Sequence, residues 1–450
     1  MAQRELERLD KKHLWHPFTQ QFLWEKEPTL IVERGRGVYF YDVNGKKYLD
    51  GVSSLWVNLL GHNHPALNRA FKKQLSKIAH STFLGLSHRP GIELARELVR
   101  IAPKNLTRVF YSDNGATAVE IALKMSFQYW REKTGQTRPE YLAVDGSYHG
   151  DTLGAVSVGS IGAFHSKFKP LLFKVHFAAQ PSCTHLEHRY RTGENVRGVS
   201  ACARAALASM EKILKARRGK IAAAILEPIV QGATGMRVQP PGYVAGFRRL
   251  CDKYNVLMIA DEVATGIGRT GTMFAVEQEN VRPDFLCLAK ALTGGYTPLA
   301  ATLTTERVYR AFYGPMRKNN TFFHGHSYTG HPLGAAVALA TLKTVSTVKL
   351  LEKTRKSAHL MKDELRSFED LPTVKSIRQA GLMAGVELAE TGMAKRVCRA
   401  LLKKGIWLRP LGATVVIMPP PIISPKDLRL LLTALKDAVR KDAVFHGSKT

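Results

Sequence analysis

The sequence predicts an α/β fold organised around a mostly parallel β-sheet that is buried on both faces. Short apolar runs of four to six residues alternate with amphipathic stretches, which is the pattern of strands connected by helices. Apolar residues recur at helical spacing in residues 116–131 and 200–215. The apolar runs between and around these stretches are residues 108–111, 141–144, 221–226, 256–260 and 285–289.

The first fifty residues are expected to be extended. Residues 30–33 and 37–41 are rich in β-formers, and Asn44-Gly45 is a strong hairpin turn before a strand at 46–49. From about residue 66 the pattern becomes helical, because Leu67, Phe71 and Leu75 fall on one face. We therefore expect a short N-terminal hairpin that leads into the first helix of the larger sheet.

The last third of the chain predicts a second, smaller α+β domain. After Gly334 a long apolar helix pattern continues through Leu342, and a Lys-rich helix is expected at 347–368. Short strands and helices follow, with a break at 419–421, where three prolines stand in a row. The expected organisation is residues 1–60 and 333–450 in the small domain and residues 61–332 in the large one.

Composition excludes several classes of protein. The chain has 450 residues with 66 Lys and Arg against 37 Asp and Glu, a formal charge of +29, which attracts polyanions without distinguishing nucleic acid from anionic metabolites. Its five cysteines, at positions 183, 202, 251, 287 and 398, form no Cys-x-x-Cys pair, so no zinc site or disulfide framework is indicated. The charged N-terminus and the absence of a long apolar stretch predict no membrane segment, and we expect a cytoplasmic protein.

Charged residues follow three of the apolar runs. Glu227 comes after 221–226, Asp261 and Glu262 come after 256–260, and Lys290 comes after 285–289. Ligands of open parallel sheets bind beyond the carboxyl ends of the strands, where these side chains should meet. A single charged residue at a strand end would be interpreted as part of an ordinary ion pair. Charged residues at the ends of three strands favour a functional site.

A lysine and a carboxylate at such an edge suit pyridoxal phosphate. Desolvation lowers the pKa of a lysine and makes its amine a nucleophile toward an aldehyde, and a carboxylate can hold a protonated ring nitrogen. Residues 112–117 could bind the phosphate, because Gly115 follows a predicted strand and opens a predicted helix. The alternative is a plain strand–turn–helix junction capped by Asp113 and Asn114.

Several stretches resemble the class III aminotransferases, and the resemblance covers essentially the whole chain. It implies a fold type I enzyme with a seven-stranded sheet, pyridoxal phosphate as cofactor and a homodimer with shared active sites. No single stretch is specific, but the set is. These stretches are Tyr111-Ser112-Asp113-Asn114-Gly115-Ala116, Ser147-Tyr148-His149-Gly150, Leu226-Glu227-Pro228, the segment 261–269 (DEVATGIGR) and Leu288-Ala289-Lys290.

The resemblance implies roles for particular residues. Lys290 would bind the cofactor covalently and shuttle the proton, and Asp261 would pair with the pyridinium nitrogen. The phosphate would be bound by Gly115 and Ala116, and by His326 and Ser327 from the partner subunit. Tyr148 would lie against the ring. The further matched positions are Glu227 at the cofactor, and Gly325 and Arg409 at the substrate, where a bidentate guanidinium suits a carboxylate.

Two more stretches resemble one branch of this family. HLWHPFT at 13–19 and HGHSYTG at 324–330 are similar to transaminases of biotin synthesis that convert 8-amino-7-oxononanoate to 7,8-diaminononanoate, by a ping-pong reaction through pyridoxamine phosphate. S-adenosylmethionine is the default donor of that branch. Phe18 and Leu55 stand where its best-known members carry tyrosine and tryptophan, although Trp56 remains, so lysine is an alternative donor.

Other functions stay open at this stage. Another class III transaminase, acting on ω-amines or ornithine, is less favoured because of the two branch-specific stretches. A polyanion-binding protein is supported only by the charge, and neither specific nucleic-acid binding nor membrane binding is expected. Three patterns are interpreted as incidental: the G-x-G-x-x-G of 266–271 as no nucleotide site, His62, His64, His324 and His326 as no metal site, and the basic residues of 215–220 as a solvated helix end.

Overall fold

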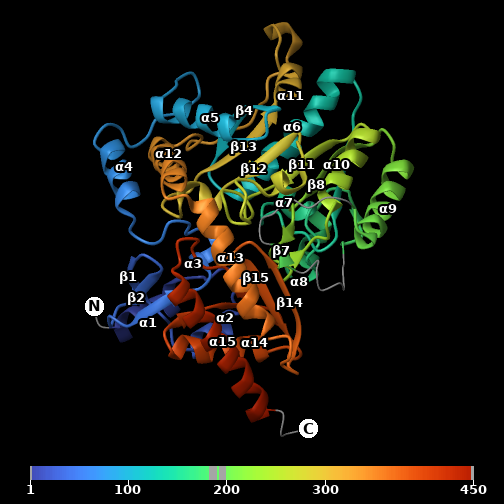
Figure 1. Ribbon diagram of the computed structural model, residues 1–450. Helices are drawn as coiled ribbons and strands as arrows, with labels where there is room; N and C mark the ends of the chain where they lie inside the picture. The colour runs from blue at the N-terminus through green and yellow to red at the C-terminus, as the bar shows by residue number, and fades with distance from the viewer. Residues whose placement is uncertain (1–2, 182–189, 192–198, 447–450) are drawn as a thin grey trace.

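The computed structural model describes residues 3–181, 190–191 and 199–446, and its larger part is a seven-stranded sheet between layers of helices (Figure 1). Six of these strands run in the same direction. β13 runs the opposite way and pairs antiparallel with both of its neighbours, β12 and β4. In spatial order the strands are β4 (Leu106–Ser112), β13 (Ala300–Thr305), β12 (Phe285–Leu288), β11 (Leu257–Asp261), β8 (Ile221–Leu226), β5 (Glu140–Val144) and β6 (Val175–Ala178).

Both faces of this sheet are apolar. Alternate residues of one strand enter different clusters: Met258 and Ala260 belong to one core, whereas Leu257 and Ile259 belong to the other. α6 (Gly115–Thr134) covers the second face. The helices that contribute to the first core are α4 (Pro65–Leu75), α5 (Arg89–Ile101), α9 (Ala201–Ala216), α10 (Tyr243–Lys253) and α12 (Pro332–Thr347). The predicted α/β fold with a mostly parallel sheet is confirmed.

Strands from the two ends of the chain share a smaller sheet. β3 (Lys47–Asp50) of the N-terminal hairpin pairs parallel with β16 (Ile406–Trp407), and both chain ends lie in the lower part of Figure 1. The division at residues 60 and 332 stays a proposal. The other elements of this part are β1 (Val32–Arg36), β2 (Tyr39–Asp42), β7 (Tyr190–Arg191), β14 (Val374–Ala380), β15 (Met383–Leu388), β17 (Arg409–Leu411), β18 (Thr414–Ile417), α13 (Leu350–Arg366), α14 (Met393–Lys403) and α15 (Pro425–His446).

The expectation that the first fifty residues are extended is wrong for the first half of that segment. α1 (Gln3–His13) and α2 (Gln21–Lys26) precede the hairpin. α1 has no buried residue, so no apolar period marked it, and the ion pairs Glu5–Arg8 and Glu7–Lys11 stabilise it along its surface. The hairpin itself is confirmed, with Gly45 in the left-handed region at φ +82°.

Two strands of the large sheet were not predicted. β13 (Ala300–Thr305) has the sequence AATLTT, and β6 (Val175–Ala178) is only four residues long, so neither has the strong apolar run of its neighbours. The short elements that complete the chain are α3 (Ser53–Trp56), α7 (Leu153–Ser157), α8 (Gly162–His165), α11 (Glu306–Ala311), β9 (Val230–Gln231), β10 (Arg237–Val238) and the 3-10 helices η1 (Ser166–Leu171), η3 (Ala275–Glu279), η4 (Lys290–Thr293) and η5 (Met316–Lys318).

Within the described ranges, no single helix is both long and apolar enough to cross a membrane. α12 and α13 satisfy the length and composition requirement only as a joined pair, which bends by 65°.

Candidate active site

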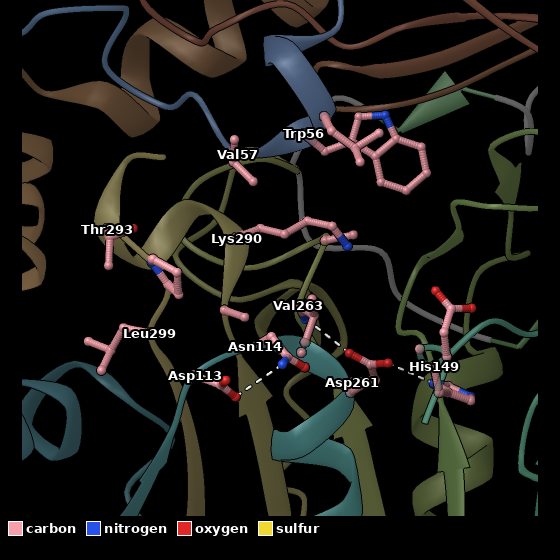
Figure 2. Close-up of a pocket in the computed structure, with 18 of the residues that line it drawn as sticks. Trp56, Val57, Asp113, Asn114, His149, Asp261, Val263, Lys290, Thr293 and Leu299 are labelled. Carbon is pink, nitrogen blue, oxygen red and sulfur yellow. Dashed lines mark hydrogen bonds and ion pairs between the residues drawn. The ribbon is translucent and has the colours of Figure 1, made fainter. Parts of the chain in front are cut away.

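A cavity of about 750 Å³ opens at the carboxyl edge of the large sheet. Its floor consists of Gly115, Glu227, Asp261 and Lys290, which follow or end strands β4, β8, β11 and β12. Its roof is the segment 53–57, of which Leu55, Trp56 and Val57 line the cavity. Figure 2 shows Trp56 and Val57 above, Asp261 and His149 below, and the Lys290 side chain between them. The prediction that the charged residues meet at one sheet edge is confirmed for Glu227, Asp261 and Lys290. It is wrong for Glu262, which does not line the cavity because its buried carboxylate accepts from the backbone N–H groups at the start of η3.

Lys290 begins η4 one residue after the end of β12, with φ at +21°. A non-glycine residue is rarely held near this conformation, and the surrounding turn fixes it here. The Nζ atom lies 5.3 Å from the centre of the Trp56 ring. Burial lowers the pKa of the Lys290 ammonium, and nearby carboxylates, Asp261 foremost, oppose this shift. The amine is therefore easier to deprotonate than an ordinary lysine, as a nucleophile requires.

Asp261 is the last residue of β11 and is only 5% exposed. Its Oδ2 lies 2.7 Å from Nδ1 of His149, and its Oδ1 accepts a hydrogen bond from the Val263 N–H at 3.1 Å (Figure 2). His149 is buried, and its Nε2 has no hydrogen-bond partner among the described residues. The histidine thus orients the carboxylate at the bottom of the cavity. Sequence reasoning missed this role, although His149 lies inside one of the stretches that carried the resemblance.

The turn before α6 is built to bind an anion. Asn114 caps the helix by accepting from the Thr117 N–H at 3.1 Å, and Thr117 Oγ1 accepts from the Asn114 N–H at 3.2 Å. Gly115 and Ala116 therefore occupy the first helical positions, whose N–H groups have no carbonyl within the helix. A Cβ on Gly115 would lie 2.6 Å from Val263 Cγ1, so only glycine fits. The capping predicted as the alternative is present at Asn114, and Gly115 and Ala116 line the cavity.

Glu227 is 6% exposed, and its carboxylate is held by backbone N–H groups. Its Oε1 accepts from the Tyr148 N–H at 3.1 Å and its Oε2 from the Gly232 N–H at 3.0 Å. Burial raises the pKa of this carboxyl to about 7, although the two backbone hydrogen bonds and His149 oppose the shift. Glu227 therefore ties three loops of the floor together and changes its charge near neutral pH.

Tyr148 stands at the side of the cavity. Its hydroxyl donates to Asp151 Oδ2 at 2.7 Å, and its ring is nearly parallel to that of His165. Burial, reinforced by Asp151, raises the pKa of the Tyr148 phenol. Phe164 packs edge-on against both Tyr148 and Phe18, with 5.2 Å between the Phe18 and Phe164 ring centres. Asp151 and Phe164 were not predicted, because neither follows a strand.

Five predicted site residues lie outside the cavity lining. Phe18 is 62% exposed. Arg409, on β17, is half-buried, burial lowers the pKa of its guanidinium, and no carboxylate pairs with it within the part of the chain that the structure describes. Gly325, His326 and Ser327 belong to the loop before α12, where His326 Nε2 lies 3.7 Å from Asp113 Oδ1. In contrast to these five residues, Leu55 does line the cavity, and its side chain is 51% exposed.

The patterns interpreted as incidental have local explanations. His62 pairs with Asp50 at 3.0 Å, His64 caps α4, and His324 contacts Lys124. No group of three or more potential metal ligands occurs among the described residues. β11 is followed by a long loop and the 3-10 helix η3 in place of the helix that a dinucleotide site needs. α9 ends at Ala216 before β8, as predicted for the basic stretch. Cys183 lies outside the described residues.

The floor carries the chemical groups that pyridoxal phosphate needs. An amine with lowered pKa, a buried carboxylate held by a histidine, and a glycine at a helix N-terminus surround one cavity. These are the groups needed for an aldehyde, a ring nitrogen and a phosphate, respectively.

Comparison with known proteins identifies the family of the chain. The family model described as aminotransferase class III matches residues 23–439. The chain belongs to the class III aminotransferase family. A relative from Aquifex aeolicus, named adenosylmethionine-8-amino-7-oxononanoate aminotransferase, is 46% identical over 97% of this chain and 98% of its own.

Two solved aminotransferase structures share the fold over almost the whole chain. The protein of that same name from Methanocaldococcus jannaschii has a TM-score of 0.91 at 40% identity, covering 98% of this chain and 99% of that one. The omega transaminase of Pseudomonas jessenii in complex with PMP has a TM-score of 0.90 at 30% identity, covering 99% and 100%. One backbone therefore accompanies two differently named activities, so the fold alone does not decide the substrate.

Proposed function

We propose that the protein is a pyridoxal-phosphate-dependent transaminase that converts 8-amino-7-oxononanoate to 7,8-diaminononanoate in biotin synthesis. The observation that carries the proposal is the meeting of Lys290, the Asp261–His149 pair and the α6 N-terminus in one cavity. The names of the relatives, at 46% and 40% identity over nearly the full chain, support the substrate.

Each floor residue has a distinct task in this proposal. With pyridoxal phosphate bound, Lys290 would hold the cofactor at its aldehyde carbon and would carry the proton that leaves the donor's carbon. Asp261, oriented by His149, would keep the ring nitrogen protonated, and the N–H groups of Gly115 and Ala116 would bind the phosphate. Pyridoxal phosphate, when bound, supplies the electron sink that makes a carbon next to nitrogen acidic. The reaction proceeds in two halves, in which the donor leaves its amine and the 7-keto group then receives it.

The substrate side is proposed to include Arg409 and the roof. The half-buried Arg409 guanidinium has no acidic partner among residues 3–181, 190–191 and 199–446, and it suits the carboxylate at the far end of the substrate. Trp56 and Leu55 offer apolar surface near Lys290, which suits the intervening alkyl chain. Phe18, Tyr148 and Gly325 are proposed to complete this contact surface.

S-adenosylmethionine is proposed as donor, with lysine as the alternative. The relatives' names include adenosylmethionine, which favours the first. Phe18 and Leu55 lack the hydroxyl and the second indole that would contact such a donor, which favours the second.

We further propose a cytoplasmic homodimer in which His326 and Ser327 reach the partner's phosphate. Neither residue lines its own chain's cavity, and the same loop exposes Phe323 and Tyr328, which are 76% and 59% exposed. Apolar surface of this kind suits a subunit interface. Light scattering tests the assembly: a dimer is expected, and a stable monomer with full activity would contradict it.

An omega-amine transaminase is the second candidate, because the Pseudomonas jessenii structure shares the fold at a TM-score of 0.90. A polyanion-binding protein remains the candidate outside enzymes and rests on the +29 charge alone. Salt-sensitive, sequence-independent DNA binding without transaminase activity would support it.

The test uses the purified protein with pyridoxal phosphate and a panel of donors, each with 8-amino-7-oxononanoate. We expect bleaching of the yellow colour by one donor and formation of 7,8-diaminononanoate, measured by mass spectrometry. Turnover of simple ω-amines with no diaminononanoate would favour the second candidate.

A further inference from the structure

Arg269 is a fully buried cation inside the G-x-G-x-x-G stretch, 0% exposed. Its backbone belongs to the loop that follows Asp261, and its carbonyl accepts from the Leu382 N–H at 3.1 Å. Burial lowers the pKa of its guanidinium, and the charge of Asp50 opposes the shift. A buried charge is costly unless hydrogen bonds compensate it, so its partners indicate what it is for.

The guanidinium joins the roof to the C-terminal part of the chain. Nη1 donates to the Pro419 carbonyl at 2.8 Å and to Ser53 Oγ at 3.3 Å, and Nη2 donates to the Asn58 carbonyl at 3.4 Å. Ser53 Oγ in turn donates to the Met418 carbonyl at 2.7 Å. Arg269 therefore contacts the chain on both sides of Leu55 and Trp56.

The roof needs such support because its backbone is strained. Ser53, Ser54 and Trp56 all lie in the left-handed region, with φ of +51°, +60° and +66°. Non-glycine residues persist there only where the surroundings hold them. The buried Asp50 carboxylate adds to this support, accepting the Ser54 N–H at 2.8 Å and contacting His62 Nε2 at 3.0 Å.

This conformation places Trp56 against the floor. Its ring lies 5.3 Å from Lys290 Nζ, and a Cβ on Gly232, whose N–H binds Glu227, would lie 3.1 Å from the indole. A relaxed roof would move the indole away from both.

We propose that Arg269 is a positioning residue, which clamps the strained roof so that Trp56 meets the substrate at Lys290. The inference rests on the proposed function, since it takes the roof as the substrate-contacting side of the cavity. The glycine-rich stretch thus connects the loop of Asp261 to the residues that contact the substrate, and Arg269 itself contacts neither substrate nor cofactor.

The test is a double-mutant cycle on the holoenzyme with Arg269→Met and Trp56→Ala. Displacing a substrate-contacting group by about 1 Å can cost roughly 100-fold, so we expect Arg269→Met to lower kcat/KM for 8-amino-7-oxononanoate roughly 10- to 100-fold. In the Trp56→Ala background the same change should cost no more than roughly twofold, because the residue through which Arg269 acts is already gone. Equal losses in both backgrounds would overturn the proposal.

A second readout does not depend on activity. The chain has five tryptophans, and 5-fluorotryptophan labelling gives each a 19F resonance, with that of Trp56 identified by its loss in Trp56→Phe. Arg269→Met should shift or broaden the Trp56 resonance in the holoenzyme. An unchanged Trp56 resonance would overturn the proposal even if kcat/KM falls.

Arg138→Met is the matched control. Arg138 is also a buried arginine that donates to a backbone carbonyl, that of Asn255 at 2.7 Å, but it lies away from the roof. It should leave the Trp56 resonance and kcat/KM unchanged. If Arg269→Met yields no folded holoenzyme, Ser53→Ala carries the cycle: a smaller loss that disappears in Trp56→Ala supports the clamp, and an undiminished loss contradicts it. Failure of the proposed function would show differently, as a wild type that no donor bleaches.

Discussion

The floor and the roof of the cavity are built in opposite ways. Asp261 and Glu227 of the floor sit at the ends of buried strands and are 5% and 6% exposed. Leu55 of the roof is 51% exposed, and three of the four residues from 53 to 56 have positive φ without being glycine. The sheet itself fixes the floor, whereas the roof is held by the nearby Asp50 carboxylate and by two distant groups, the Arg269 guanidinium and the Met418 carbonyl.

The difference separates chemistry from selectivity. A floor set by strand order can be shared by every protein with this backbone, including the omega transaminase at a TM-score of 0.90. A roof held by a few buried hydrogen bonds can change its side chains without changing the sheet. We therefore expect floor substitutions to abolish amine transfer and roof substitutions to redistribute it among substrates.

The largest expected effect is that of Lys290→Ala. Loss of the proton carrier alone should lower turnover roughly 10²- to 10⁴-fold, and covalent cofactor attachment should disappear. Borohydride reduction of the wild type followed by peptide mass spectrometry should locate the cofactor on Lys290. Lys253→Ala, on the surface, is the control; a label on any lysine other than Lys290 would refute the assignment.

Asp261→Asn should be the next most damaging change. The amide cannot keep a ring nitrogen protonated by charge, so turnover should fall roughly 10²- to 10³-fold, with weaker cofactor binding and an intact fold. Stopped-flow absorbance of the donor half-reaction measures turnover, and circular dichroism tests whether the fold is intact. Asp252→Asn, on the exposed side of α10, should behave as wild type, and near-normal turnover of Asp261→Asn would exclude the proposed role.

Glu227→Gln probes the floor through pH. Burial raises the pKa of Glu227 from 4.5 to about 7, so the folded protein holds its proton more tightly than the unfolded chain. The stability that this group contributes is complete below its unfolded pKa and is lost as pH rises to about 7. The loss is about 3 kcal/mol.

Denaturant unfolding of the cofactor-free protein between pH 4.5 and 7 measures this loss of stability from Glu227. The unfolding free energy of wild type should fall relative to that of Glu227→Gln as pH rises. A constant difference between the two proteins would show that Glu227 titrates normally, and Glu352→Gln, at an exposed position on α13, is the control.

The smallest effects belong to the roof. Leu55→Trp should favour S-adenosylmethionine over lysine by about 0.5–2 kcal/mol, because a new aromatic face can lie beside a sulfonium or an adenine. Donor half-reactions followed by absorbance give the ratio, and Phe18→Tyr should act in the same direction. If Leu55→Trp changed the rates with both donors by the same factor, Leu55 would have no role in donor selectivity.

The two regions also differ in how far the sequence predicted them. β8 was predicted at its observed bounds, and Glu227, Asp261 and Lys290 were located by strand ends, because a buried parallel strand has an unmistakable apolar run. β13 was missed, since its AATLTT sequence does not stand out, and α1 was missed because it buries nothing. His149 and Arg269 stood in quoted stretches, but their partners are 112 and more than 140 residues away, so only the fold reveals their contacts.

One single-turnover measurement tests the central claim most directly. The protein is loaded with pyridoxamine phosphate, freed of donor and mixed with 8-amino-7-oxononanoate, and product and absorbance are followed together. The account predicts one 7,8-diaminononanoate per active site as the yellow form returns, and almost none from Lys290→Ala. A wild type that stays colourless and forms no diamine would contradict it.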